Sequence, residues 1–204
     1  MGKVEIQPAG PTYSEIVGGL IHQTASELWS YLFDSDLAVF ERYVSGLWSL
    51  PHNTFSHTEA FVLKDSQDDV VCGLELGYRG DAKKELGSSL VTGRDSFLTQ
   101  QELAAMAPLE RGLSYMTPAV PATAYYLQFF SIAPTHQGRG LGSRLMEHCI
   151  SRARHQNCRS VHLDVTTHNP AVSVYKSLGF YVAAETRLPE KEALPSFYRM
   201  VKRL

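Results

Sequence analysis

The sequence predicts an α/β fold in which a mixed, mostly antiparallel central sheet of about six to seven strands is flanked by helices. Several short stretches alternate apolar and polar residues, as strands with one buried face do. Other stretches repeat apolar residues with a period near 3.6, as amphipathic helices do. One apolar strand leads through a glycine-rich turn directly into a helix. With 204 residues and 44% hydrophobic content, we expect one core and a single domain over residues 1–204.

Composition excludes several classes of protein. The formal net charge of −2 and the pI near 6.4 indicate neither a nucleic-acid nor a membrane partner. No signal peptide begins the chain and no apolar run approaches ~20 residues, so we expect a cytoplasmic protein. Cys72, Cys149 and Cys158 lack paired metal spacing and are expected to be reduced, buried thiols. His52 and His57 fit no recognised ligand spacing, so no metal is predicted.

The first part of the chain reads as a strand, two helices and a strand pair. Residues 3–7 alternate and form the first predicted strand. A helix is predicted over residues 14–32, with the serine at its start as a cap, and a second over residues 34–47. Residues 57–63 and 70–78 are predicted to be antiparallel strands joined by a polar turn.

Residues 79–122 differ from the rest because glycines and prolines interrupt them repeatedly. Within them only residues 99–106 keep a helical pattern, with Thr99 as the cap and Glu102 three residues later. A long segment without periodicity inside a compact domain is usually a functional excursion. We interpret it as an insertion between the third and fourth strands. Two interpretations stay open: it covers part of a binding site, or it is a disordered or surface loop.

The most informative stretch runs from a strand over residues 125–132 to a helix that starts at Leu141. Pro134 ends the strand, and residues 137–142, Gln-Gly-Arg-Gly-Leu-Gly, form the turn. Glycines let backbone N–H groups approach a ligand closely. The start of the helix adds unpaired N–H groups and the positive end of its dipole. This pattern predicts an anion site.

The glycine spacing distinguishes among phosphate-binding families. A Walker loop needs lysine and then serine or threonine after its last glycine, whereas Gly142 is followed by serine and arginine. A dinucleotide fingerprint needs G-x-G-x-x-G, whereas Gly138, Gly140 and Gly142 are spaced G-x-G-x-G. The pattern Gln-x-x-Gly-x-Gly, which begins at Gln137, resembles the acyl-CoA pyrophosphate loop of the GNAT N-acetyltransferase superfamily.

The residues after this helix form a second motif. Residues 158–165 are predicted to be a strand, a short helix follows Asn169 and Pro170, and residues 197–201 form a closing strand. The helical region resembles Asn-x-x-Ala-x-x-x-Tyr-x-x-x-Gly-Phe of the same superfamily. Ala171, Tyr175, Gly179 and Phe180 match in register, while His168 takes the position of the usual asparagine and Asn169 comes one place late.

The resemblance covers residues 127–180 and implies a GNAT-like acyl-CoA N-acyltransferase fold. It further implies acetyl-CoA as co-substrate, no metal, and a small amine or peptide as acceptor, attacked directly in a ternary complex. The expected cofactor-binding residues are Phe130, Ser131, Ile132, Gln137, Gly138, Arg139, Gly140, Leu141, Gly142, Ser143, Arg144, His168, Asn169 and Tyr175.

Two catalytic roles follow from the chemistry of this reaction. Tyr175 is the expected acid for the departing thiolate, since a phenol has a reference pKa of about 10. Many relatives carry a glutamate base on the fourth strand, where this chain has Gln128. We rank Glu75, an isolated carboxylate between two leucines, as the first alternative base. The other candidates are His57, Glu59, His162 and Asp164.

A second functional hypothesis stays open. Because the fourth strand lacks the glutamate, the chain is alternatively a non-catalytic module that binds or senses acyl-CoA. The oligomeric state, monomer or homodimer, is not indicated by the sequence.

Overall fold

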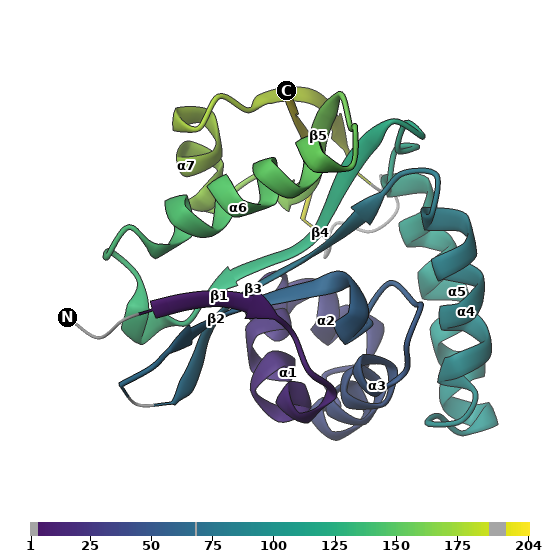
Figure 1. The fold of residues 1–204 in the computed structure, drawn as a ribbon. Coiled ribbons are helices and arrows are strands. Elements are labelled where there is room, and N and C mark those ends of the chain that lie inside the picture. The colour runs from purple at the N-terminus through teal and green to yellow at the C-terminus, as the bar shows by residue number, and fades with distance from the viewer. Residues whose placement is uncertain (1–3, 68, 188–194) are drawn as a thin grey trace.

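The computed structural model describes residues 4–67, 69–187 and 195–204. Seven strands form one sheet in the order β1-β2-β3-β4-β5-β7-β6 (Figure 1). Their bounds are β1 Val4–Pro8, β2 Ala60–Asp65, β3 Val70–Arg79, β4 Ala124–Ile132, β5 Ser160–Thr166, β6 Tyr181–Thr186 and β7 Phe197–Arg203. Every adjacent pair is antiparallel except β4 and β5, which are parallel. The predicted fold class is confirmed.

Helices cover both faces of the sheet. They are α1 Ser14–His22, α2 Ser26–Leu32, α3 Leu37–Ser49, α4 Lys83–Arg94, α5 Gln100–Met116, α6 Leu141–His155 and α7 Ala171–Ser177. Short 3₁₀ turns are η1 Pro11–Tyr13, η2 His57–Glu59 and η3 Pro134–His136. Figure 1 shows α1 to α3 on one side of the first strands and α6 on the other, with α4 and α5 at the edge.

The first predicted helical region proves to be two helices, α1 and α2, rather than one over residues 14–32. The chain turns at Gln23, whose side chain donates to the backbone oxygen of Ile132 on β4 at 3.0 Å. This contact draws the turn against the sheet and stops the helix. Ser14 is the first residue of α1 rather than its cap, so that part of the prediction is wrong.

Two other boundaries are shifted by local hydrogen bonds. Helix α3 begins at Leu37 rather than residue 34, because the Asp36 carboxylate accepts the N–H groups of the next turn and caps the helix there. Strand β2 begins at Ala60 rather than residue 57, because the Ser56 hydroxyl accepts the N–H of Thr58 at 3.1 Å and holds a 3₁₀ turn. Both signals are short polar side chains that compete with the periodic pattern.

The segment between β3 and β4 contains two packed helices. The predicted capping box is confirmed: Thr99 accepts from the N–H of Glu102, whose carboxylate accepts from the Thr99 N–H. The helix it starts is α5, which continues to Met116, well beyond the predicted residue 106. Helix α4 was not predicted, because two internal glycines weaken its pattern and Leu86 is its one buried residue.

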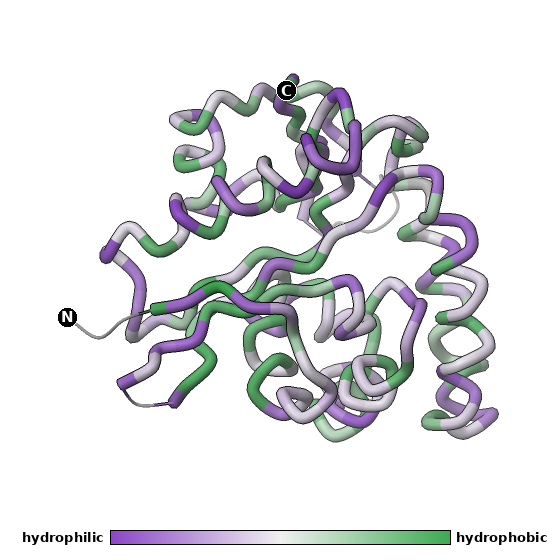
Figure 2. The backbone as a smooth tube through the Cα atoms, viewed as in Figure 1, coloured by the Kyte–Doolittle hydropathy of each residue, from purple (hydrophilic) through white to green (hydrophobic). Residues whose placement is uncertain are grey.

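Strand β4 contributes to two large hydrophobic clusters, and a smaller third one contains Leu63, Cys72, Ile132 and Leu145. One cluster joins α1, α2 and α3 with the middle strands and with Leu86, Leu98 and Met106 of the inserted segment. The other joins α6 and α7 with β5 and β7. In Figure 2 hydrophobic segments lie along the central strands, while α4 and α5 alternate between polar and apolar residues. The three cysteines are free and buried, as predicted.

No helix within the described ranges is both long and apolar enough to cross a membrane.

The close approach of α3 to the inserted segment generates a stability prediction. A Cβ on Gly46 would lie 2.4 Å from the ring of Phe97, whereas a Cβ on Gly87 of α4 would meet nothing within 4 Å. Gly46→Ala should therefore lower the free energy of unfolding by about 1–3 kcal/mol. Gly87→Ala, the matched control, should raise it by about 0.5–1 kcal/mol. Urea unfolding of both variants measures this, and equal stability of the two would contradict the packing described.

Candidate active site

The parallel pair β4 and β5 parts halfway along the sheet. The two strands pair from Ala124 and Ser160 to Leu127 and Leu163. Beyond that point β4 continues beside β3, and β5 continues beside β7. In the described part of the chain, the edge of β4 from Gln128 onward therefore has no neighbouring strand on the side of β5. Such an edge presents backbone N–H and C=O groups to an extended, amide-containing ligand.

A β-bulge lies where the two strands part. The register between β3 and β4 shifts so that Leu76 pairs with Phe129 and Gly77 with Leu127, which leaves Gln128 without a partner on β3. The Gln128 side chain donates to the oxygen of Thr54 at 2.9 Å. The bulge redirects the backbone at this point, which is a common device beside a functional site.

The glycine-rich turn lies at the other end of the free edge. Gly138 and Gly140 have φ values of 74° and 75°, in the left-handed region that favours glycine. Gly140 caps α6, and its oxygen accepts the N–H of Arg144 at 3.2 Å. The N–H groups before Arg144 in the helix thus have no intrahelical acceptor. The Gln137 side chain ties the turn to β4 by donating to the oxygen of Ile132 at 2.9 Å.

One cavity of about 970 Å³ joins these features. Eleven of the fourteen expected cofactor-binding residues line it: Phe130, Ser131, Ile132, Gln137, Gly138, Gly140, Leu141, Gly142, Ser143, Asn169 and Tyr175. Its size is at the upper end of the range for small-molecule sites. The sequence motifs thus come together around one space, even though they lie on four different elements.

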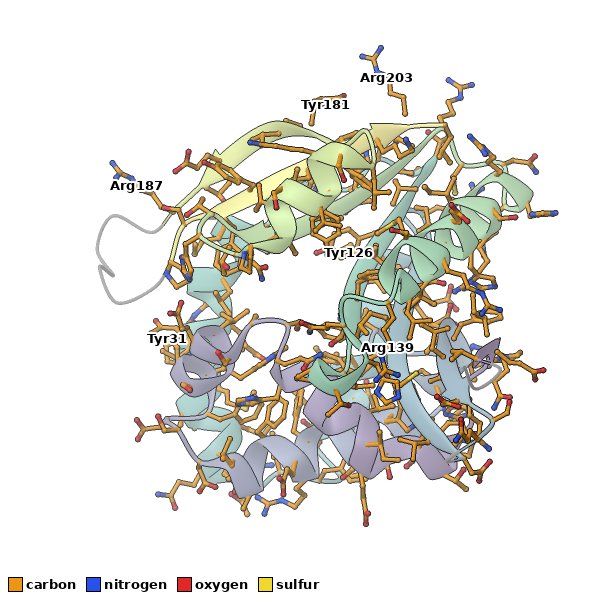
Figure 3. The ribbon with its side chains drawn as sticks, turned by 90° about the vertical axis from the view of Figure 1, so that its left-hand side faces the viewer. Tyr31, Tyr126, Arg139, Tyr181, Arg187 and Arg203 are labelled. Carbon is orange, nitrogen blue, oxygen red and sulfur yellow. The ribbon has the colours of Figure 1, made fainter. Side chains whose placement is uncertain are left out.

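Three expected side chains lie outside this cavity. Arg144 donates to the oxygen of Val4 at 2.6 Å and is held against β1. His168 is exposed and faces Glu27 at 3.5 Å. Arg139 is exposed on the turn before α6 (Figure 3). The structure therefore does not support a cofactor contact for the first two side chains.

Tyr175 reaches the cavity from α7. Its ring packs against Phe130 at 6.4 Å and Phe180 at 5.8 Å between centroids. Burial raises the pKa of Tyr175, so the phenol is protonated at neutral pH. Within the described part of the chain no hydrogen bond is made by its hydroxyl, which is therefore available to a ligand.

Glu75 does not lie in the cavity. Its carboxylate is fully buried and accepts hydrogen bonds from the Tyr125 hydroxyl at 2.8 Å and from Arg152 at 3.0 Å, and it contacts the His148 ring at 2.9 Å. These partners are on β4 and α6, on the face of the sheet opposite α1 to α3. Neither Glu75 nor any of these three partners lines the cavity. The structure does not support Glu75 as the general base, so we correct that assignment.

Of the other candidate bases, Asp164 is the one that lines the cavity. His57 makes a hydrogen bond with the oxygen of Trp48 at 2.7 Å. His162 lies 3.0 Å from the Ser160 hydroxyl, and burial, followed by the Arg199 charge, lowers its pKa. Among the residues described, no group of three or more His, Cys, Asp and Glu side chains is arranged to hold a metal ion.

Sequence reasoning missed the aromatic wall opposite the glycine turn. Trp29, Phe55 and Phe129 pack together with centroid separations of 5.0 to 6.2 Å and line the cavity. Leu113 and Met116 of α5 extend this wall. In the sequence Trp29 fits a helical period and Phe129 lies in an apolar strand, and both patterns are the same for a core residue and for a cavity wall.

The fold and the cavity define a class: a mixed-sheet α/β protein whose parted strands and glycine turn line one cavity. Residues 87–180, just under half of the chain, match the model of the acetyltransferase (GNAT) family. Both sequence motifs lie wholly or largely inside this match. Residues 87–180 are therefore similar to the GNAT acetyltransferase family.

Individual acetyltransferases are also similar to this chain in sequence or in structure. A streptothricin acetyltransferase from Streptomyces lavendulae is 36% identical over 55 residues, which cover 26% of this chain and 29% of that protein. An N-acetyltransferase structure from Staphylococcus aureus Mu50 has a TM-score of 0.68 at 14% identity, covering 97% and 100% of the two chains. A structure described as SsHAT has a TM-score of 0.62 at 25% identity and covers 98% of each chain.

The glycine turn generates a binding prediction. Acetyl-CoA should raise the melting temperature, because a ligand that binds the folded state at a hundredfold excess over its Kd adds about 2.7 kcal/mol to the free energy of unfolding. NAD and ATP should raise the melting temperature far less. Gly142→Asp should remove the shift, because a carboxylate would lie where the pyrophosphate binds. Gly87→Asp is the control for added charge on a helix. A folded Gly142→Asp variant with an unchanged shift would refute the site.

Proposed function

We propose that this protein transfers the acetyl group of acetyl-CoA to a primary amine of a small molecule, amino acid or peptide by direct attack in a ternary complex. The observation that carries this proposal is that one cavity joins the glycine turn, the free edge of β4, the Tyr175 hydroxyl and a separate apolar wall. Both substrates then have a place in the same space, which direct transfer requires. The family match supports the same reaction.

The chain's own groups fit the cofactor. The unpaired N–H groups at the start of α6 suit the pyrophosphate charges. The free edge over residues 130–132 suits a pantetheine arm, whose amides resemble a peptide. A backbone N–H beside the bulge at Gln128 would polarise the acetyl carbonyl and stabilise the negative charge that develops on its oxygen. Tyr175 would give its proton to the departing sulfur. Free, buried cysteines suit a reducing, cytoplasmic setting.

The alternative is a non-catalytic module that binds acyl-CoA. One observation favours it: Gln128, a neutral residue, stands where many relatives have a glutamate, and its amide is engaged by Thr54 and by the Tyr78 hydroxyl. Thiol release from acetyl-CoA over a broad panel of amines distinguishes the two. Acetyl-CoA binding without release for any amine would favour the module.

Tyr175 allows a sharper test of turnover. Tyr175→Phe should lower kcat by about 10- to 10³-fold and leave the acetyl-CoA Kd nearly unchanged, because the hydroxyl is needed most when charge has collected on the sulfur. Tyr181→Phe, at an exposed position on β6 (Figure 3), is the matched control and should be silent. Single-turnover rates and calorimetric binding measure the two effects. A drop in affinity that parallels the drop in rate would make Tyr175 a binding residue instead.

A further inference from the structure

The part of the cavity away from the glycine turn is apolar and aromatic. Its walls include Leu28, Trp29, Leu32, Tyr43, Phe55 and Phe129. Tyr43 packs edge-on against Phe55 at 5.4 Å, and Phe55 packs on Phe129 at 5.0 Å, so the rings form a preorganised surface. A ligand body that fits here gains most from burying apolar area and from ring contacts.

This apolar region meets a single carboxylate. Among the described residues that line the cavity, Asp164 is the one acidic side chain, and its side chain is 15% exposed. It is the first residue of β5 beyond the last pair with β4, just as Gln128 is on β4. Asp164 therefore stands across the opening from the bulge, where the acetyl carbonyl is expected.

Three hydrogen bonds fix the Asp164 carboxylate. The Tyr126 hydroxyl donates to Oδ2 at 2.8 Å, and Arg199 donates from Nε to Oδ1 at 2.6 Å and from Nη2 to Oδ2 at 2.8 Å. Since a carboxylate has about four lone-pair positions, one is left at Oδ1, and Asp164 lines the cavity. Figure 3 shows Tyr126 at the opening between the half of the molecule with α7 and the half with α1 and α2.

Two basic side chains, Arg199 and Lys83, lie near the Asp164 carboxylate. Arg199 is 3% exposed and also donates to the oxygen of Pro118 at 2.8 Å. The Lys83 ammonium lies 4.5 Å from the centre of the Tyr126 ring. Burial, followed by the Arg199 charge, lowers the pKa of Lys83, while the Asp164 charge acts in the opposite direction. The Arg199 guanidinium, 2.6 Å from Asp164 Oδ1, would repel an acceptor with several ammonium groups.

We propose that the acceptor is an apolar primary monoamine with an aryl-sized body, and that Asp164 accepts first the hydrogen bond and then the proton of its amino group. This inference rests on the proposed function and specifies its second substrate. The body would occupy the aromatic region, and the nitrogen would lie between Asp164 and the acetyl carbonyl.

The protons balance as follows. An ammonium and a thioester give an amide, a thiol and one free proton. Asp164 takes the first proton from nitrogen before attack and releases it to solvent. The second leaves the nitrogen as the C–N bond forms and the C–S bond breaks, and it replaces the proton that Tyr175 gives to the sulfur.

A substrate panel tests the acceptor class. With saturating acetyl-CoA, kcat/KM for 2-phenylethylamine should exceed those for L-phenylalanine and spermidine by tenfold or more. L-Phenylalanine carries a carboxylate, which 2-phenylethylamine lacks, and spermidine would place several charges along an apolar wall. Preference for spermidine or for the amino acid would overturn the inference while leaving acetyl transfer intact. Absence of thiol release with every amine, despite binding of acetyl-CoA, would instead refute the proposed function.

Leu113→Trp tests the wall itself. Leu113 is a partly buried cavity residue on α5, so a larger side chain there narrows the apolar region without cutting into the core. The variant should lower kcat/KM for 2-phenylethylamine by tenfold or more and leave that for ethylamine within threefold. Equal losses for both amines would place the aryl group elsewhere.

Asp164→Asn tests the proton acceptor, since asparagine retains the size of aspartate but cannot take up a proton. The expected loss in kcat/KM is 10²-fold or more for 2-phenylethylamine. For 2,2-difluoro-2-phenylethylamine, whose fluorines lower the amine pKa so that more of it is already neutral, the loss should be tenfold or less. A purely structural role predicts the same loss for both amines and would overturn the assignment. Asp81→Asn, at an exposed ion pair with Arg79, is the control.

Discussion

The end of the pairing between β4 and β5 is the constraint on which the rest of the molecule depends. After Leu127 and Leu163 the two strands need different partners, and each half of the sheet accordingly has its own hydrophobic cluster. A strand edge inside a protein would normally carry unsatisfied backbone groups. Here the edge opens on a cavity of about 970 Å³, so a ligand or solvent can satisfy them. The place where the pairing of β4 and β5 ends is thus also the place where the candidate active site lies.

A second interaction holds α6 against β3 and β4. On the face opposite the cavity, Glu75 of β3 binds Arg152 and His148 of α6 and the Tyr125 hydroxyl of β4. Because breaking a buried ion pair by removing one partner typically costs about 3–5 kcal/mol, this cluster fixes α6 on the sheet. The start of α6 carries the glycine turn, so the cluster positions this turn relative to the free edge. Glu75 therefore stabilises the packing of α6 on the sheet, although its position between two leucines in the sequence suggested a catalytic base.

The sequence could predict those features that local backbone chemistry controls. The glycine turn, the Thr99 capping box and the short helix with Tyr175 each depend on residues within one or two turns of chain, and the sheet class followed from periodicity. Features that depend on distant partners could not be predicted. The partners of Glu75 lie on other elements, the break between α1 and α2 follows from the contact of Gln23 with β4, and the aromatic residues near Trp29 have the same periodicity as a core.

This division between local and distant control also separates the two sides of the cavity. The side next to α6 is made by backbone groups, namely a strand edge, a bulge and glycines with positive φ, and it suits a cofactor of fixed structure. The opposite side is made by side chains from α2, α3, β4 and α5, which individual substitutions can change without moving the backbone. Asp164 lies where the two sides meet. The reaction would thus be set by the parted strands and the choice of amine by the helices around them, including α5 of the inserted segment.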